Sequence, residues 1–140
     1  TPLYSSAASD VYKRQVKEII KYCKQQEIKL AFVSSTSKNN INSIFFCLRD
    51  SLNKKDFDFI GNSKLVKKLK PSAEIYKLAL KELKLKPKEC IAIEDTQVSL
   101  NSAVKAKLKC FIFPGNFHRS KKFNGAFKEI SKINKNIFKS

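Results

Sequence analysis

Residues 68–95 read KLKPSAEIYKLALKELKLKPKECIAIED, and this stretch decides the fold class. Between residues 71 and 83 the apolar side chains recur at helical spacing; they are Ile75, Leu78, Ala79 and Leu83. This spacing predicts an amphipathic helix, with Pro71 in its first turn. The apolar run of residues 90–93 then stops at Glu94 and Asp95, as a buried parallel strand stops at a loop. The stretch therefore predicts a helix followed by a strand that ends in carboxylates.

The same alternation of helix and strand patterns extends through the rest of the chain. Further apolar runs of strand type cover residues 30–33, 57–60 and 110–113. Further helical patterns cover residues 16–26, 40–52 and 96–105. In the tail, the pattern allows a short edge strand at residues 127–130 and a final helix at residues 133–138. Repeated strand-helix units predict an α/β domain built on a three-layer, Rossmann-like parallel sheet with helices on both faces.

The first fifteen residues, TPLYSSAASDVYKRQ, show no helical or strand periodicity. Residues 5–15 resemble the translation of a transposase-based sequencing adaptor, and residues 1–4 fit the index segment before it. We therefore expect residues 1–15 to be a non-native, adaptor-derived segment. The natural domain would then occupy residues 16–140.

The composition indicates one folded domain with a strong positive charge. The chain has 140 residues, of which 42% are hydrophobic, and this is enough for one core. Its net charge is +17, but among 29 basic residues only Arg14, Arg49 and Arg119 are arginines. Phosphate and groove recognition favours the forked guanidinium, so the lysine-rich pattern disfavours a nucleic-acid partner. A genome rich in A/T, whose codons favour Lys, Asn and Ile, explains the charge at least as well.

Cysteine usage and hydropathy point to a cytoplasmic protein. Cys23, Cys47, Cys90 and Cys110 occur singly and without a CxxC motif, which is typical of reduced thiols in a protein core. No apolar stretch approaches the length of about 18 residues that a membrane span needs, and no secretory signal pattern opens the chain. We expect a soluble protein without a membrane partner.

Candidate site residues follow the predicted strands, because ligands of an open parallel sheet bind beyond the carboxyl ends of its strands. Ser34, Ser35 and Thr36 follow the first strand and offer hydroxyl and backbone N–H groups of the kind that hold a phosphate. The alternative is that these residues cap the next helix or form a turn.

The acidic pair after the clearest strand is the second candidate. Glu94 and Asp95 would repel each other at a buried strand end unless a cation or several donors lay between them. Mg²⁺ fits this pair because it takes carboxylate oxygens and keeps some of its waters. Alternatively, Asp95 caps the following helix, an arrangement that is compatible with metal binding.

Lys70 is the third candidate because it directly precedes Pro71. Proline restricts the backbone of the residue before it, so the Lys70 ammonium could project from a rigid loop and neutralise phosphate charge. Taken alone, one lysine among many is more often on the surface.

Three segments together resemble the haloacid dehalogenase-like hydrolases, and within them the phosphatase and β-phosphoglucomutase-like subgroup. These segments are VSSTS at residues 33–37, KLKPSAEIYKLALKELKLKPKECIAIED at 68–95 and FPGN at 113–116. The resemblance covers residues 16–133, and the spacing from Lys-Pro to the acidic pair is fairly specific.

The resemblance implies a role for each candidate. Ser34 would bind the transferring phosphoryl group, with Ser35 beside it. Lys70 would bridge the phosphate and the nucleophilic carboxylate. Asp95 would be the Mg²⁺ ligand, and Glu94 a second or outer-shell carboxylate.

The sequence departs from the family pattern in two respects. The helix after the acidic pair carries Ser99, Asn101 and Lys107 where the family usually has Gly and small residues. Nothing from residue 16 onward reads as the family's first motif, an apolar strand followed by DxDxT or DxDxV. The attacking aspartate, the acid–base aspartate and the cap domain would then lie upstream, as would the central strand of the sheet. We expect a partial core domain that is inactive by itself and marginally stable, since central backbone hydrogen bonds would lack partners.

For the whole protein, the resemblance implies a Mg²⁺-dependent phosphatase that acts on a small phosphorylated metabolite, a sugar phosphate, through an aspartyl-phosphate. A phosphomutase of the β-phosphoglucomutase type is the alternative within the family. A basic module that binds nucleic acid or another anionic surface is the alternative outside it. We expect a monomer.

Overall fold

Parallel strands form two small sheets in the computed structural model, which describes residues 6–113 and 123–139. In the first sheet, β1 (Ala31–Val33) pairs with β2 (Phe59–Gly61). In the second sheet, β4 (Lys109–Ile112) lies between β3 (Ile91–Glu94) and β5 (Lys128–Glu129). Every strand pair is parallel, as the alternating patterns predict. Within the described residues, no strand pairing joins β1 to β3, and the missing central strand stays a prediction.

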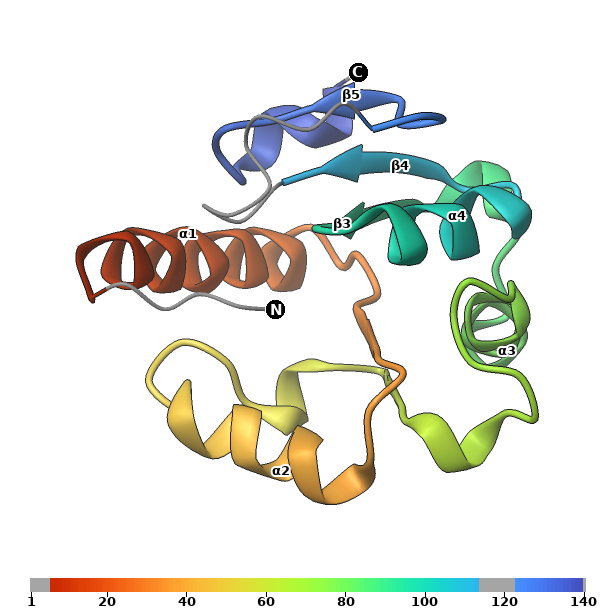
Figure 1. The fold of residues 1–140 in the computed structure, drawn as a ribbon. Helices are drawn as coiled ribbons and strands as arrows, with labels where there is room; N and C mark the ends of the chain where they lie inside the picture. Colours follow the sequence, from red (N-terminus) through yellow and green to blue (C-terminus); the bar gives the residue numbers. More distant parts are fainter. Residues whose placement is uncertain (1–5, 114–122, 140) are drawn as a thin grey trace.

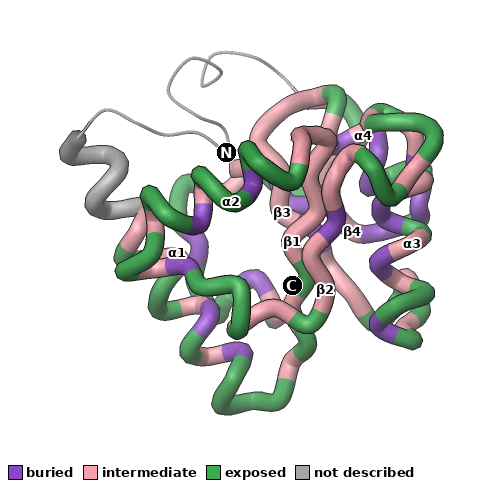
Figure 2. Tube along the Cα trace, turned by 90° about the horizontal axis from the view of Figure 1, so that it is seen from below, coloured by how far each residue is buried: buried purple, intermediate pink, exposed green. Residues whose placement is uncertain are grey.

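Helices cover the strands on two sides, which gives the predicted three-layer α/β arrangement. The helices are α1 (Ser6–Gln25), α2 (Lys38–Cys47), α3 (Glu74–Leu83) and α4 (Gln97–Lys105). Figure 2 shows α1 and α2 on one side of the strands and α3 and α4 on the other. In Figure 1, β4 lies close to α4, while α2 lies at the opposite end of the molecule.

The described residues form two hydrophobic cores. One core joins α3, α4 and the strands β3 and β4, and its most buried side chains include Ile75, Leu100 and Ile112. The other joins α1 and α2 to the first sheet around Ile41 and Phe45. Its rings pack edge to face; they are Phe32, Phe45 and Phe57. Val33, at the carboxyl end of β1, packs against the core of α3, α4 and the second sheet, so this core also reaches the first sheet.

Close packing of α3 on the first sheet depends on a glycine. A Cβ atom placed on Gly61 in β2 would lie 2.7 Å from Cδ1 of Ile75, which is inside van der Waals contact. Ile75 is 1% exposed, so its side chain has little room to move away. Gly61 therefore lets α3 approach the strand that pairs with β1.

Several predicted boundaries are wrong. α1 begins at Ser6, although residues 6–15 show no amphipathic pattern. Once a helix has formed, each added residue costs little, so it can extend without an apolar stripe. The origin of residues 1–15 stays a prediction. Pro71 is not in the first turn of α3, which begins three residues later at Glu74. The tail helix is a 3-10 helix, Lys135–Lys139. Of the FPGN segment, residues 114–116 lie outside the described residues.

Two side-chain placements also differ from the predictions. Leu78 is only half-buried, and Tyr76 takes a buried place in the α3 stripe. Cys47 is exposed rather than part of the core, while all four cysteines are free thiols. Within the described residues, no helix combines the length and the apolar composition that a membrane span needs.

Candidate active site

The loop after β1 is organised by its own hydroxyl groups. The backbone N–H of Ser34 donates to the Gly61 carbonyl at 3.0 Å, which continues the β1–β2 pairing. The hydroxyl of Ser34 accepts from the N–H of Thr36 at 3.1 Å, and the Thr36 hydroxyl accepts from the Asn40 amide at 2.8 Å. Ser37 caps α2, so the predicted capping role belongs to Ser37, whereas the bond from the Thr36 N–H to the Ser34 hydroxyl is the predicted turn. The Ser34 hydroxyl hydrogen is left to donate to a ligand.

Lys70 joins the carboxyl ends of the two sheets. Its ammonium donates to the Glu94 carboxylate at 2.8 Å and to the Val33 carbonyl at 3.4 Å. Its backbone N–H donates to the Ser35 hydroxyl at 3.2 Å. The side chains of Lys70 and Glu94 are 7% and 10% exposed, so the alternative of an ordinary surface lysine is wrong. The structure thus brings together the lysine, the serine loop and the acidic pair.

Tyr76 is a member of this cluster that the sequence analysis missed. Its hydroxyl donates to the same Glu94 oxygen, Oε2, that Lys70 binds. The Lys70 ammonium also lies 5.3 Å from the centre of the Tyr76 ring. Burial and the neighbouring Glu94 charge raise the pKa of Tyr76 well above 10.0, so it acts as a neutral donor. The sequence offered one signal for Tyr76. It lies beside the helical stripe of Ala79 and Leu83, and a buried tyrosine needs a hydrogen-bond partner for its hydroxyl.

The acidic pair lies where β3 meets α4. Glu94 is the last residue of β3, and Asp95 follows it as a half-buried residue. Thr96 caps α4, since its hydroxyl accepts from the N–H of Ser99 at 3.2 Å. The alternative that Asp95 is the cap is therefore wrong.

The donor set suits Mg²⁺, which is typically held by one or two carboxylates together with waters and substrate oxygens. Glu94 and Asp95 supply two adjacent carboxylates. Among the residues that the structure describes, no group of three or more His, Cys, Asp or Glu side chains gathers in one place. The pair therefore fits a metal that keeps open positions better than one that needs a closed cage of protein ligands.

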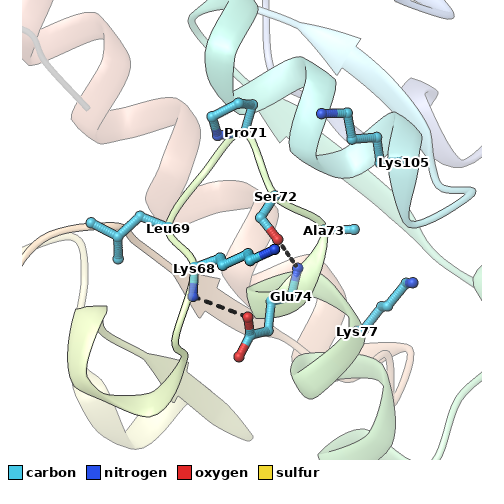
Figure 3. Close-up of a pocket in the computed structure, with 8 residues that line it drawn as sticks. All are labelled: Lys68, Leu69, Pro71, Ser72, Ala73, Glu74, Lys77 and Lys105. Atoms are coloured by element: carbon cyan, nitrogen blue, oxygen red, sulfur yellow. Dashed lines mark hydrogen bonds between the residues drawn. The ribbon is translucent and has the colours of Figure 1, made fainter.

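The loop that carries Lys70 is also held by hydrogen bonds to side chains of α3 and α4. The Glu74 carboxylate accepts from the N–H groups of Lys67 at 2.8 Å and Lys68 at 3.0 Å, and these bonds lower the pKa of Glu74. The fully buried Ser102 donates from its hydroxyl to the Ser72 carbonyl at 2.6 Å. An open pocket beside this loop contains further lysines, as Figure 3 shows. The residues that line this pocket are not the candidate residues; they are Lys68, Leu69, Pro71, Ser72, Ala73, Glu74, Lys77 and Lys105.

The sequence model of the haloacid dehalogenase-like hydrolases matches residues 6–113, and the chain belongs to this family. Among curated relatives, protein CbbY of Cereibacter sphaeroides is 33% identical over 111 residues, which are 79% of this chain and 48% of CbbY. This chain thus spans about half the length of that relative.

Solved structures agree with the family assignment. CbbY from Rhodobacter sphaeroides in complex with phosphate superposes with a TM-score of 0.80 and 30% identity, over 87% of this chain and 54% of CbbY. A mutant of that protein in complex with xylulose-(1,5)bisphosphate has a TM-score of 0.78 and 31% identity, over 85% of this chain and 53% of the mutant chain. A β-phosphoglucomutase from Clostridium difficile has a TM-score of 0.68 and 27% identity, over 92% of this chain and 56% of that one.

Proposed function

We propose that this chain forms the core part of a Mg²⁺-dependent phosphatase that hydrolyses a small phosphorylated metabolite, a sugar phosphate, through an aspartyl-phosphate. One observation carries the proposal: the buried Lys70 ammonium reaches both the end of β1 and the carboxylate at the end of β3. A phosphoryl group held between these strand ends would meet a fixed positive charge and serine hydroxyls. Such preorganised donors lower the barrier to phosphoryl transfer.

Each candidate residue takes one role in this mechanism. Ser34, with Ser35 and Thr36 beside it, binds the non-bridging phosphoryl oxygens through hydroxyl and N–H groups. Lys70 neutralises charge on the same oxygens and orients the attacking carboxylate. Asp95 and Glu94 would hold the Mg²⁺, which supplies further charge neutralisation when it is bound.

We place the attacking aspartate on a strand between β1 and β3 that residues 16–140 do not contain. Each of these two strands pairs along one edge within the described residues, so the other edge is open to a further strand. A carboxylate oxygen of that aspartate attacks phosphorus while the bond to the sugar oxygen breaks, and the upstream acid–base aspartate gives this oxygen a proton that it later takes back from the attacking water. Water then cleaves the acyl phosphate, which releases inorganic phosphate and restores the carboxylate. On this proposal, residues 16–140 alone are inactive.

The substrate class rests on the similarity to CbbY, whose structures contain phosphate or xylulose-(1,5)bisphosphate. The similarity to a β-phosphoglucomutase supports a second candidate, a phosphomutase in which the sugar takes the phosphoryl group back. We also place the protein in the cytoplasm, which suits its free thiols, and expect it to act as a monomer.

The test is an assay of the protein expressed from the intact gene that encodes this chain. Phosphate release from a panel of sugar phosphates should require Mg²⁺ and should fall at least about 100-fold in Asp95→Asn, because a charged ligand is lost. Isomerised sugar phosphate without net phosphate release would favour the mutase. Absence of both activities, together with DNA retention that is steeply salt-dependent and unaffected by Asp95→Asn, would favour the basic binding module.

A further inference from the structure

We propose that Tyr76 is a positioning residue that sets the orientation of the Glu94 carboxylate and so determines how tightly the acidic pair binds a divalent cation. This inference rests on the proposed function, since it assigns a further residue to the same site. It concerns the hydrogen bond from Tyr76 to Glu94, and the family resemblance implies no role for Tyr76.

The two donors to Glu94 converge on one oxygen. Tyr76 Oη and Lys70 Nζ both donate to Oε2, and the two donors come from different segments of the chain. In the described part of the chain, no donor is found on Oε1 of Glu94. Since an ionised carboxylate accepts through both oxygens, this pattern reserves Oε1 for a ligand outside the protein.

Tyr76 is held too firmly for its contact with Glu94 to be incidental. It is 8% exposed in the core that joins α3, α4 and the second sheet. The helix α3 sets its backbone, and the approach of α3 to Gly61 sets the position of the helix. The Lys70 ammonium lies over its ring, which adds attraction between the two donors of Glu94. The hydroxyl therefore restrains the carboxylate from a rigid element, as residues behind a metal ligand do.

The test compares the Mn²⁺ affinity of the protein expressed from the intact gene with that of its variants by electron paramagnetic resonance titration, with Mn²⁺ as the probe for Mg²⁺. Tyr76→Phe keeps the ring and removes only the hydroxyl, so we expect a Kd about 10-fold higher than for the unaltered chain. Tyr22→Phe is the matched control, because Tyr22 stacks on Phe138 away from the acidic pair. Its Kd should be unchanged.

A second variant separates positioning from packing. Leu83→Val removes a methylene group from the same buried face of α3 without touching Glu94. If it lowers the urea midpoint as much as Tyr76→Phe while its Mn²⁺ affinity is unchanged, the positioning role is supported.

Equal Mn²⁺ affinity of Tyr76→Phe and the unaltered chain would overturn the inference and leave the proposed function standing. A loss of affinity in Leu83→Val equal to that in Tyr76→Phe would also overturn it. If the unaltered protein does not bind Mn²⁺ and Asp95→Asn leaves phosphate release unchanged, both this inference and the metal part of the proposed function fail.

Discussion

Replacing Lys70 by methionine should destabilise the protein strongly, because the Lys70–Glu94 pair is buried. The two charged atoms are 2.8 Å apart, and the side chains are 7% and 10% exposed. Methionine has a similar volume, but it leaves the Glu94 carboxylate with Tyr76 as its donor and no compensating charge. Breaking such a pair typically costs about 3–5 kcal/mol, out of a usual total stability of about 5–15 kcal/mol for a small domain.

The assay is equilibrium unfolding in urea of the protein expressed from the intact gene, monitored by circular dichroism. With a denaturant slope of about 1–3 kcal/mol per molar urea, the midpoint of Lys70→Met should fall by at least about 1 M. Lys77→Met, at an exposed position on α3, should change the unfolding free energy by about 0.5 kcal/mol or less. The double variant Lys70→Met with Glu94→Gln should recover most of the loss, because no unpaired buried charge remains. A loss below about 1 kcal/mol in the single variant, or none recovered in the double variant, would refute the reasoning.

Three further predictions follow from packing, hydrogen bonding and thiol burial. Gly61→Ala should lower the unfolding free energy by about 1–3 kcal/mol, because the added methyl group meets Ile75; an unchanged urea midpoint would contradict this. Ser102→Ala should cost about 1–3 kcal/mol, because it removes the buried hydroxyl that donates to the Ser72 carbonyl, and thermal unfolding can measure this loss. Burial raises the pKa of Cys110 from 9.0 to about 12, so the folded state holds this proton more tightly and stability should fall as pH rises above 9.0. Cys110→Ala should flatten that fall, and Ellman's reagent should label the exposed Cys47 first in the native protein.

Local patterns predicted the element types well, because each relies on interactions close in the chain. The apolar runs after residues 30 and 90 are strands β1 and β3, and the stripe ending at Leu83 is α3. The boundaries were less predictable. α1 extends to Ser6 although no apolar stripe in residues 6–15 predicts it, since backbone hydrogen bonding alone continues a helix.

The candidate site was predicted in its members but not in its contacts. Lys70, the serines after β1 and the acidic pair could be found from the sequence, because strand ends in parallel sheets gather at one edge. That Lys70 is buried against Glu94 depends on segments 24 residues apart, and no local signal reports such a distance. Tyr76 was overlooked for the same reason, since a helical stripe shows that a residue is buried but not what its hydroxyl meets.

The sequence by itself therefore determined the family, the parallel α/β class and the residue types available for phosphoryl chemistry, because these follow from periodicity and from motifs read along the chain. Only the tertiary structure decided that the strands form two sheets, that Lys70 joins them, and that Tyr76 and Lys70 share one oxygen of Glu94. These features depend on how α3 packs against the strands, and such packing is set by non-local contacts that sequence spacing does not encode.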